Sequence, residues 1–256
     1  YFISPQVWAS RKGRINRIKK TVDHMMVLFP FEKKVYDDAG IPVTFVGHPF
    51  LDTILPGPDK NYSTRPGEQV HIGIFPGSRR QVIKWNLPVM ERTAELIKQK
   101  YGNLRFTVVG MSNLKGSYTT KLDVAYDVDY QTRRQFDLAI TVSGTVTLEN
   151  ALLGIPMIVV YHLPWLMYYL LKSMVIVSHV CIVNLVMGET VDPECIQRDA
   201  DPGKVSDLAV SWLKDRSILC QIQAKYKQFR EMLGGATGAA SGAIKRVAGL
   251  VIERIK

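Results

Sequence analysis

Cysteine is scarce in this chain of 256 residues. The sequence holds Cys181, Cys195 and Cys220, and their spacing is irregular. Three cysteines so placed are too few for a disulfide framework and lack the paired spacing of a zinc site. We therefore expect no structural metal and a reducing, cytoplasmic environment.

The sequence also lacks an uninterrupted apolar run long enough to span a membrane, which needs about 20 residues. Between residues 151 and 187 the only residue charged at neutral pH is Lys172, but Pro164 and Lys172 divide this stretch. Trp165 stands in it among leucines. Interfacial contact with lipid or an acyl chain is one interpretation, and a helix buried between layers is the other.

Negative charge is in deficit, since 33 Lys and Arg oppose 23 Asp and Glu for a formal net charge of +10. This balance favours an anionic partner. Six of the positive residues fall within residues 11–20: Arg11, Lys12, Arg14, Arg17, Lys19 and Lys20. They are interleaved with Ile15 and Ile18, and Val22 continues the helical spacing. The pattern predicts a basic amphipathic helix, either on an anionic membrane surface or simply solvated. Nucleic acid is not favoured, because the run has no aromatic residue to stack on a base.

Short apolar runs alternate with helical patterns along the chain, which is typical of α/β folds with parallel strands and helix crossovers. The first run, over residues 1–7, reads as a strand. Residues 55–67 collect proline and glycine and predict a linker. Residues 81–100 predict a helix whose Ile83, Leu87, Met90, Ala94 and Ile97 form a core stripe.

The most informative stretch is residues 72–80, a buried strand that runs into Pro76-Gly77-Ser78-Arg79-Arg80. Gly77 allows close approach of the backbone, Ser78 offers a hydroxyl, and Arg79 offers a bidentate positive fork. These groups suit a diphosphate. The alternative is that Gly77 and Ser78 only cap the next helix and that the arginines are solvated.

A second strand, over residues 136–142, ends in Ser143-Gly144-Thr145 and opens a helix that carries Glu149. The start of this helix offers unpaired N–H groups and a positive dipole end. Glu149 lies four residues after Thr145, on the same helix face. Its carboxylate can accept bonds from two ribose hydroxyls. The alternative is a glutamate stabilised by the dipole of its own helix.

Two further polar residues are candidates of lower specificity. Asn184 interrupts the apolar run of residues 182–188, so its amide must bond either to backbone or to a ligand. His48, in Gly47-His48-Pro49, most simply shapes a turn at the domain junction. No Ser or Cys is placed by sequence as a catalytic partner for His48.

Six short phrases of the chain belong together: Ser4-Pro5-Gln6-Val7-Trp8-Ala9, Leu28-Phe29-Pro30-Phe31-Glu32, Phe45-Val46-Gly47-His48-Pro49, Pro76-Gly77-Ser78-Arg79-Arg80, Ser143-Gly144-Thr145 with Leu148-Glu149, and Asn184-Leu185 with Gly188. Together they closely resemble one family, that of the lipid-A-disaccharide synthases, and the match is collinear over nearly the whole chain. The resemblance implies an α/β fold of GT-B type with two Rossmann-like domains. It divides the chain into 1–54 from the N-terminal acceptor-side domain, the linker 55–67, a UDP-sugar-binding domain 68–233, and a C-terminal helix 234–256.

The resemblance also implies an activity. The family transfers 2,3-diacylglucosamine from UDP to 2,3-diacylglucosamine 1-phosphate with inversion, and needs neither metal nor cofactor. By analogy, the donor would contact Gly77, Ser78, Arg79, Gly144, Thr145, Glu149 and Asn184. The protein would lie peripherally on the inner face of the inner membrane. The resemblance leaves open whether it forms a homo-oligomer.

By the same analogy, the family's candidate catalytic acid or base lies upstream of Tyr1. We therefore expect the 256 residues alone to bind UDP without transferring sugar. Two alternatives remain at this point: another UDP-sugar transferase or epimerase of the same fold, and a membrane-associated UDP-binding remnant without catalysis.

Overall fold

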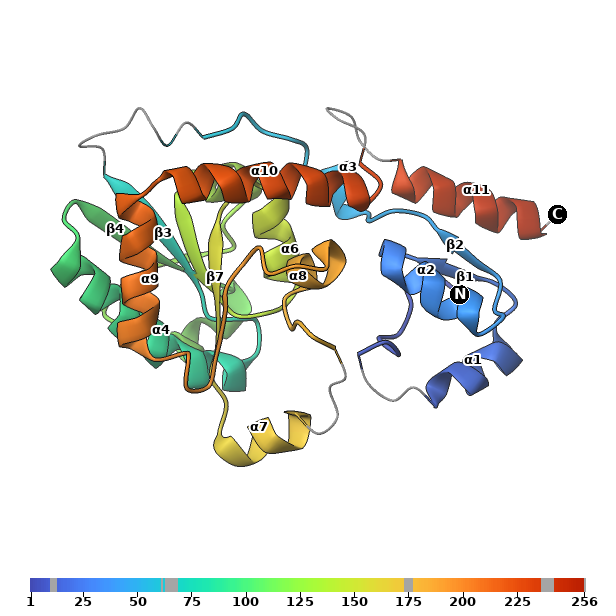
Figure 1. Cartoon of the computed structure of the whole chain (residues 1–256), viewed down its shortest axis with the longest axis horizontal. Helices are drawn as coiled ribbons and strands as arrows, with labels where there is room; N and C mark the ends of the chain where they lie inside the picture. Colours follow the sequence, from blue (N-terminus) through green and yellow to red (C-terminus); the bar gives the residue numbers. More distant parts are fainter. Residues whose placement is uncertain (10–12, 61, 63–68, 173–176, 236–241, 256) are drawn as a thin grey trace. The chain divides into compact units, whose positions relative to one another are not determined.

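The computed structural model describes residues 1–9, 13–60, 62, 69–172, 177–235 and 242–255. The chain forms two compact units (Figure 1). Unit 1 comprises residues 1–56, 169–178 and 227–256, and unit 2 comprises residues 57–168 and 179–226. The predicted domain boundaries stay a prediction.

Unit 2 is built on six parallel strands: β3 (Val70–Phe75), β4 (Leu104–Gly110), β5 (Asp123–Tyr126), β6 (Leu138–Thr141), β7 (Met157–Tyr161) and β8 (Glu194–Ile196). Their order across the sheet is β5-β4-β3-β6-β7-β8. The central strands β3 and β6 are buried except at the half-buried His71, as is usual for a parallel sheet covered on both faces. Ile72 of β3 faces Phe106 of β4 on one side and Leu138 of β6 on the other.

Helices connect and cover these strands: α4 (Arg80–Lys100), α5 (Tyr130–Arg133), α6 (Thr145–Leu152), α8 (Ile182–Met187) and α9 (Pro202–Lys214), with the 3-10 helix η2 (Ser112–Ser117) after β4. Helix α4 carries the predicted stripe from Ile83 to Ile97, and its members are buried, which confirms that prediction. Helix α9 packs beside α4, and α8 beside α6 (Figure 1). Two helices, α7 (Trp165–Lys172) and α10 (Ser217–Met232), cross the boundaries between the units.

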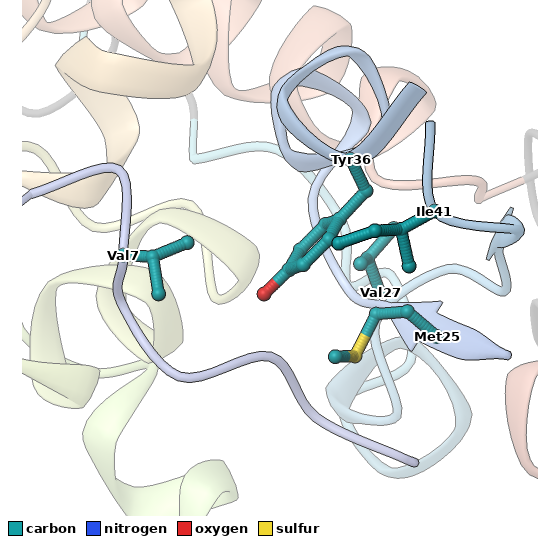
Figure 2. Close-up of a cluster of buried hydrophobic side chains, with 5 residues drawn as sticks. All are labelled: Val7, Met25, Val27, Tyr36 and Ile41. Carbon is teal, nitrogen blue, oxygen red and sulfur yellow. The ribbon is translucent and has the colours of Figure 1, made fainter. Parts of the chain in front are cut away.

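Unit 1 has a two-stranded parallel sheet of β1 (Met25–Val27) and β2 (Val43–Phe45), with helices α1 (Arg14–Thr21), α2 (Pro30–Asp38), α3 (Phe50–Thr53) and α11 (Ala243–Ile255). Its core contains Val7, Met25, Val27, Tyr36 and Ile41 (Figure 2). The buried Tyr36 hydroxyl lies 2.7 Å from the Ser4 hydroxyl, so the core retains one satisfied polar pair.

The strand predicted over residues 1–7 is wrong. Only a single parallel bridge forms there, between Phe2 and Met26. Pro5 lacks the N–H that a ladder needs, and Ile3 adopts a positive φ of 68°. These two residues limit pairing although the run is apolar.

Candidate functional site

The sheet of unit 2 has a topological switch point between β3 and β6. From β3 the chain moves outward to β4 and β5, and it then returns to β6 and moves the other way to β7 and β8. This is the Rossmann strand order, and ligands of such sheets bind outside the carboxyl ends of the strands at the switch point. Phe75 at the end of β3 pairs with Thr141 at the end of β6. We call the two predicted strand-loop-helix segments, which run from β3 into α4 and from β6 into α6, the two junctions; both therefore begin at the same edge of the sheet.

The two junctions are also in contact. Gly77, in the loop after β3, has a φ of +111°, which a residue with a side chain rarely adopts. A Cβ at this position would lie 2.9 Å from Val82 Cγ1 and 3.2 Å from Val142 Cγ2. Val142 belongs to the loop after β6, so the absence of a side chain at Gly77 lets the two loops approach.

Ser78 and Arg79 are exposed beyond this contact. Arg79 is the N-cap residue of α4 with extended backbone, and its side chain makes no capping bond. Within the described residues, Arg79 forms no ion pair. The guanidinium is therefore available to an anion, as the diphosphate interpretation requires.

Arg79 acts electrostatically on the end of a third strand. Burial raises the pKa of Tyr161, the last residue of β7, and the positive charge of Arg79 opposes that rise. Next to Tyr161, the His162 N–H donates to Asn86 Oδ1 at 2.7 Å. Asn86 Nδ2 donates in return to the His162 carbonyl at 3.2 Å, and so α4 is tied to the end of β7.

The second junction opens helix α6. Gly144 is its N-cap and no side chain makes a capping bond. Gly144 and Thr145 are exposed, and a Cβ at Gly144 would meet nothing within 4 Å. The first turn thus presents backbone N–H groups and the positive end of the helix dipole toward solvent.

Glu149 lies on α6 but is not without partners. Its Oε2 accepts from Arg133 Nη1 at 2.7 Å, and its Oε1 accepts from the Tyr130 hydroxyl at 3.2 Å. The side chains of Arg133 and Glu149 are 7% and 19% exposed, so the ion pair is largely buried. Glu149 is therefore held by Arg133 and Tyr130 and not only by the dipole of its own helix. Its predicted contact with ribose stays a prediction.

Asn184 on α8 is completely buried and fully hydrogen-bonded inside the protein. Its Oδ1 accepts from the N–H groups of Val191 and Asp192, each at 2.9 Å. Its Nδ2 donates to the Asp192 carbonyl at 2.6 Å and to Glu194 Oε1 at 2.9 Å. The Asn184 amide was expected to bond either to backbone or to a ligand, and in the structure its partners are protein groups, three of the four being backbone. Contact with the donor stays a prediction that would require exchanging one of these bonds.

His48 lies in unit 1 and shapes a turn. Its Nδ1 accepts from the Phe50 N–H at 3.1 Å, and its carbonyl accepts from the Leu51 N–H at 3.0 Å. The ring contacts those of Phe29 and Phe50, with centroids 5.5 and 4.9 Å away. Burial lowers the pKa of His48 to about 4, which keeps the ring neutral near pH 7.

The start of α7 exposes apolar side chains. Trp165, Leu166 and Met167 are 47%, 81% and 43% exposed. Among the described helices, none combines the length and the hydrophobicity needed to cross a bilayer. The buried interpretation of this stretch is wrong for these three residues. In unit 1, a surface pocket of about 320 Å³ is lined by Tyr1, Thr21, Val22, Asp23, His24, Met26, Leu250 and Val251.

The sequence matches the family model described as lipid-A-disaccharide synthetase over residues 1–245. The chain belongs to the lipid-A-disaccharide synthetase family. That family consists of glycosyltransferases, and the recognition made from the motifs is confirmed.

Curated lipid-A-disaccharide synthases match the whole chain. The protein from Geobacter sulfurreducens is 39% identical over 268 residues, covering 100% of this chain and 68% of the relative. That from Geobacter metallireducens is 37% identical over the same length, with the same shares. The chain therefore spans about two thirds of these members of the lipid-A-disaccharide synthetase family.

Solved structures show the fold. The glycotransferase of kitacinnamycin aligns with a TM-score of 0.54 and 15% identity, covering 91% of this chain and 55% of that one. An S. aureus MnaA structure with UDP aligns with a TM-score of 0.58 and 11% identity, covering 94% and 63%. The predicted fold class, α/β of GT-B type, is confirmed. At these identities the likeness shows the fold alone.

Proposed function

We propose that unit 2 binds the UDP part of a sugar nucleotide at the switch point between β3 and β6. The observation that carries this proposal is the contact between the two junction loops, where Gly77 lies against Val142. The loop after β3 supplies Ser78 and Arg79 for the diphosphate. Gly144 and Thr145 supply N–H groups at the start of α6, and Glu149 on the same helix supplies acceptors for ribose.

The reaction that we propose is the one known for the family. The bond between the anomeric carbon of 2,3-diacylglucosamine and the UDP oxygen breaks, and the 6-hydroxyl oxygen of 2,3-diacylglucosamine 1-phosphate bonds to that carbon as its proton passes to a general base. The negative charge that develops on the leaving diphosphate would be stabilised by Arg79 and by the dipole of α6. Fixed positive groups of this kind lower the barrier because they are oriented before the reaction begins.

We further propose that the two lipid substrates are reached from an anionic membrane surface on its cytoplasmic side. Exposed Trp165, Leu166 and Met167 at the start of α7 suit the headgroup boundary. On α1, Ile15 and Ile18 pack against the core of unit 1 while Arg14, Arg17, Lys19 and Lys20 are exposed. The contact of α1 with a membrane would therefore be electrostatic rather than inserted. Arg11 and Lys12 lie outside the described residues.

Calorimetric titration of the 256-residue chain tests the donor site. UDP should bind, whereas uridine and inorganic diphosphate should each bind at least tenfold more weakly, because each makes only one of the two sets of contacts. Equal affinity for diphosphate and UDP would contradict the proposed ribose contact. Absence of binding heat with UDP would contradict the proposed site as a whole. An assay with radiolabelled donor and the lipid acceptor tests the reaction itself: we expect no transfer by the 256 residues alone, and transfer would show that they contain the catalytic group.

A further inference from the structure

Three residues around Glu149 form a compact arrangement that the motifs of the chain do not include. Arg133 and Tyr130 belong to the short helix α5, which follows β5, whereas Glu149 and Asn150 belong to α6. Arg133 Nη1 donates to Glu149 Oε2 at 2.7 Å, and Arg133 Nη2 donates to Asn150 Oδ1 at 2.7 Å. The guanidinium thus bridges two successive residues of α6.

The guanidinium is itself held in place. Arg133 lies 5.1 Å from the centre of the Phe75 ring and 5.5 Å from that of the Tyr130 ring. Arg133 is only 6% exposed, so it can change rotamer only by breaking buried contacts. Phe75 is the last residue of β3, immediately before the loop that carries Gly77. The same arginine therefore contacts both sides of the switch point.

Each oxygen of Glu149 has one partner. Oε1 accepts from the Tyr130 hydroxyl at 3.2 Å, and Oε2 accepts from Arg133. A carboxylate has about four acceptor positions, so each oxygen retains capacity for one more donor. The partially exposed carboxylate of Glu149 has its rotamer fixed from within the protein and keeps the acceptors that two vicinal hydroxyls would use.

We propose that Arg133 and Tyr130 are positioning residues that orient the Glu149 carboxylate for the ribose 2′ and 3′ hydroxyls and thereby make the site selective for ribonucleotides. This inference rests on the proposed function of the switch-point site. In this proposal neither Arg133 nor Tyr130 contacts the nucleotide. Arg133 acts through its charged, bidentate hold on α6, and Tyr130 acts through the second oxygen.

The test is the ratio of the dissociation constants for 2′-deoxy-UDP and UDP, measured by calorimetry with the complete 256-residue chain. A hydrogen bond to a charged group implies that the unaltered protein prefers UDP by about tenfold or more. Arg133→Lys keeps the charge but loses the bidentate geometry, and Tyr130→Phe removes only the hydroxyl. Both should bring the ratio toward one while affinity for inorganic diphosphate is unchanged. The control is Arg92→Lys, in an exposed pair with Glu95 at 2.8 Å.

The ratio is a property of folded molecules, so partial unfolding lowers the number of binding sites and not the ratio. If Arg133→Lys has no measurable sites, the result with Tyr130→Phe decides. A ratio that stays at the unaltered value in the folded variants overturns the positioning role but leaves UDP binding standing. A ratio of one in the unaltered protein overturns it as well, because Glu149 would then not contact the 2′ hydroxyl. Absence of UDP binding in the unaltered protein instead contradicts the proposed function.

Discussion

The two junctions at the switch point differ in how their polar groups are used. In the loop after β3, Ser78 and Arg79 are exposed, and Arg79 forms no ion pair with the described residues. On α6, Glu149 is held by Arg133 and Tyr130. Altering the first junction should change binding without changing stability, whereas altering the second should change both.

The largest effect expected from this difference is on the stability of Glu149→Gln. Removing one partner of a buried ion pair leaves the other charge buried and unpaired, which costs about 3–5 kcal/mol. Arg133 would keep its bond to Asn150 and its ring contacts, so we expect the lower end of this range. Urea denaturation should show an unfolding free energy that is lower by about 3 kcal/mol.

The matched control is Glu95→Gln, which removes the acidic partner of an exposed pair with Arg92. Exposed pairs contribute less than about 1 kcal/mol. If Glu149→Gln were no less stable than Glu95→Gln, the buried pair would not stabilise the fold, and the comparison between the junctions would fail.

A second, slightly smaller effect concerns the network of Asn184. Asp192, whose backbone bonds to Asn184, is completely buried, and its Oδ2 has no hydrogen-bond partner among the described residues. Burial raises the pKa of Asp192 to about 7, and the Tyr226 hydroxyl, which donates to Oδ1, opposes the rise. The network therefore includes a carboxyl group that is easier to bury when protonated.

The raised pKa of Asp192 makes the unfolding free energy depend on pH. Between about pH 4 and pH 7 the folded state keeps a proton on Asp192 that the unfolded state releases, so stability falls as pH rises and levels off above pH 7. From pH 5 to pH 8 the loss should be about 2–3 kcal/mol. The measurement is the difference in unfolding free energy between the unaltered protein and Asp192→Asn at each pH. A difference that is constant with pH would contradict the buried, protonated state.

Arg79→Ala tests the other junction. We expect the free energy of UDP binding to weaken by about 2 kcal/mol, within the usual range for a hydrogen bond to a charged group. The midpoint of urea unfolding should be unchanged, because Arg79 makes no capping bond and no ion pair within the described residues. Arg92→Ala is the control for lost charge on the same helix. A loss of stability with Arg79→Ala would show that this arginine is structural after all.

The sequence predicted the positions where backbone geometry is decisive. Gly77 is required by a positive φ and by the approach of Val142, and a glycine two residues after a buried apolar strand indicates such a turn. The stripe on α4 was predictable because it repeats at helical spacing. These features depend on residues that are close together in the chain.

Arg133 was missed for the opposite reason. Its partners Glu149 and Asn150 lie 16 and 17 residues away, and Phe75 lies on another strand. Nothing near Arg133 in the sequence distinguishes it from exposed Gln131, Thr132 and Gln135 or from half-buried Arg134. Asn184 was recognised as a polar residue in an apolar run, but the sequence could not choose between ligand and backbone partners, since these come from the loop that returns to β8. A local sequence pattern does not show which residues of different helices and strands come into contact.

The smallest effects are expected where polar and apolar groups both face solvent, on α1 and α7. Arg17 and Lys20 are exposed, and each basic residue near an anionic surface contributes about 1 kcal/mol, which salt screens. Arg17→Ala combined with Lys20→Ala should therefore weaken flotation with anionic vesicles at low salt and have little effect at high salt. Lys98→Ala with Lys214→Ala, two exposed lysines of unit 2, is the control with the same change in charge. Leu166→Ser should weaken flotation at both salt concentrations, because apolar contact is not screened. Equal weakening by the control pair would mean that net charge alone attracts the protein, and that α1 provides no specific surface.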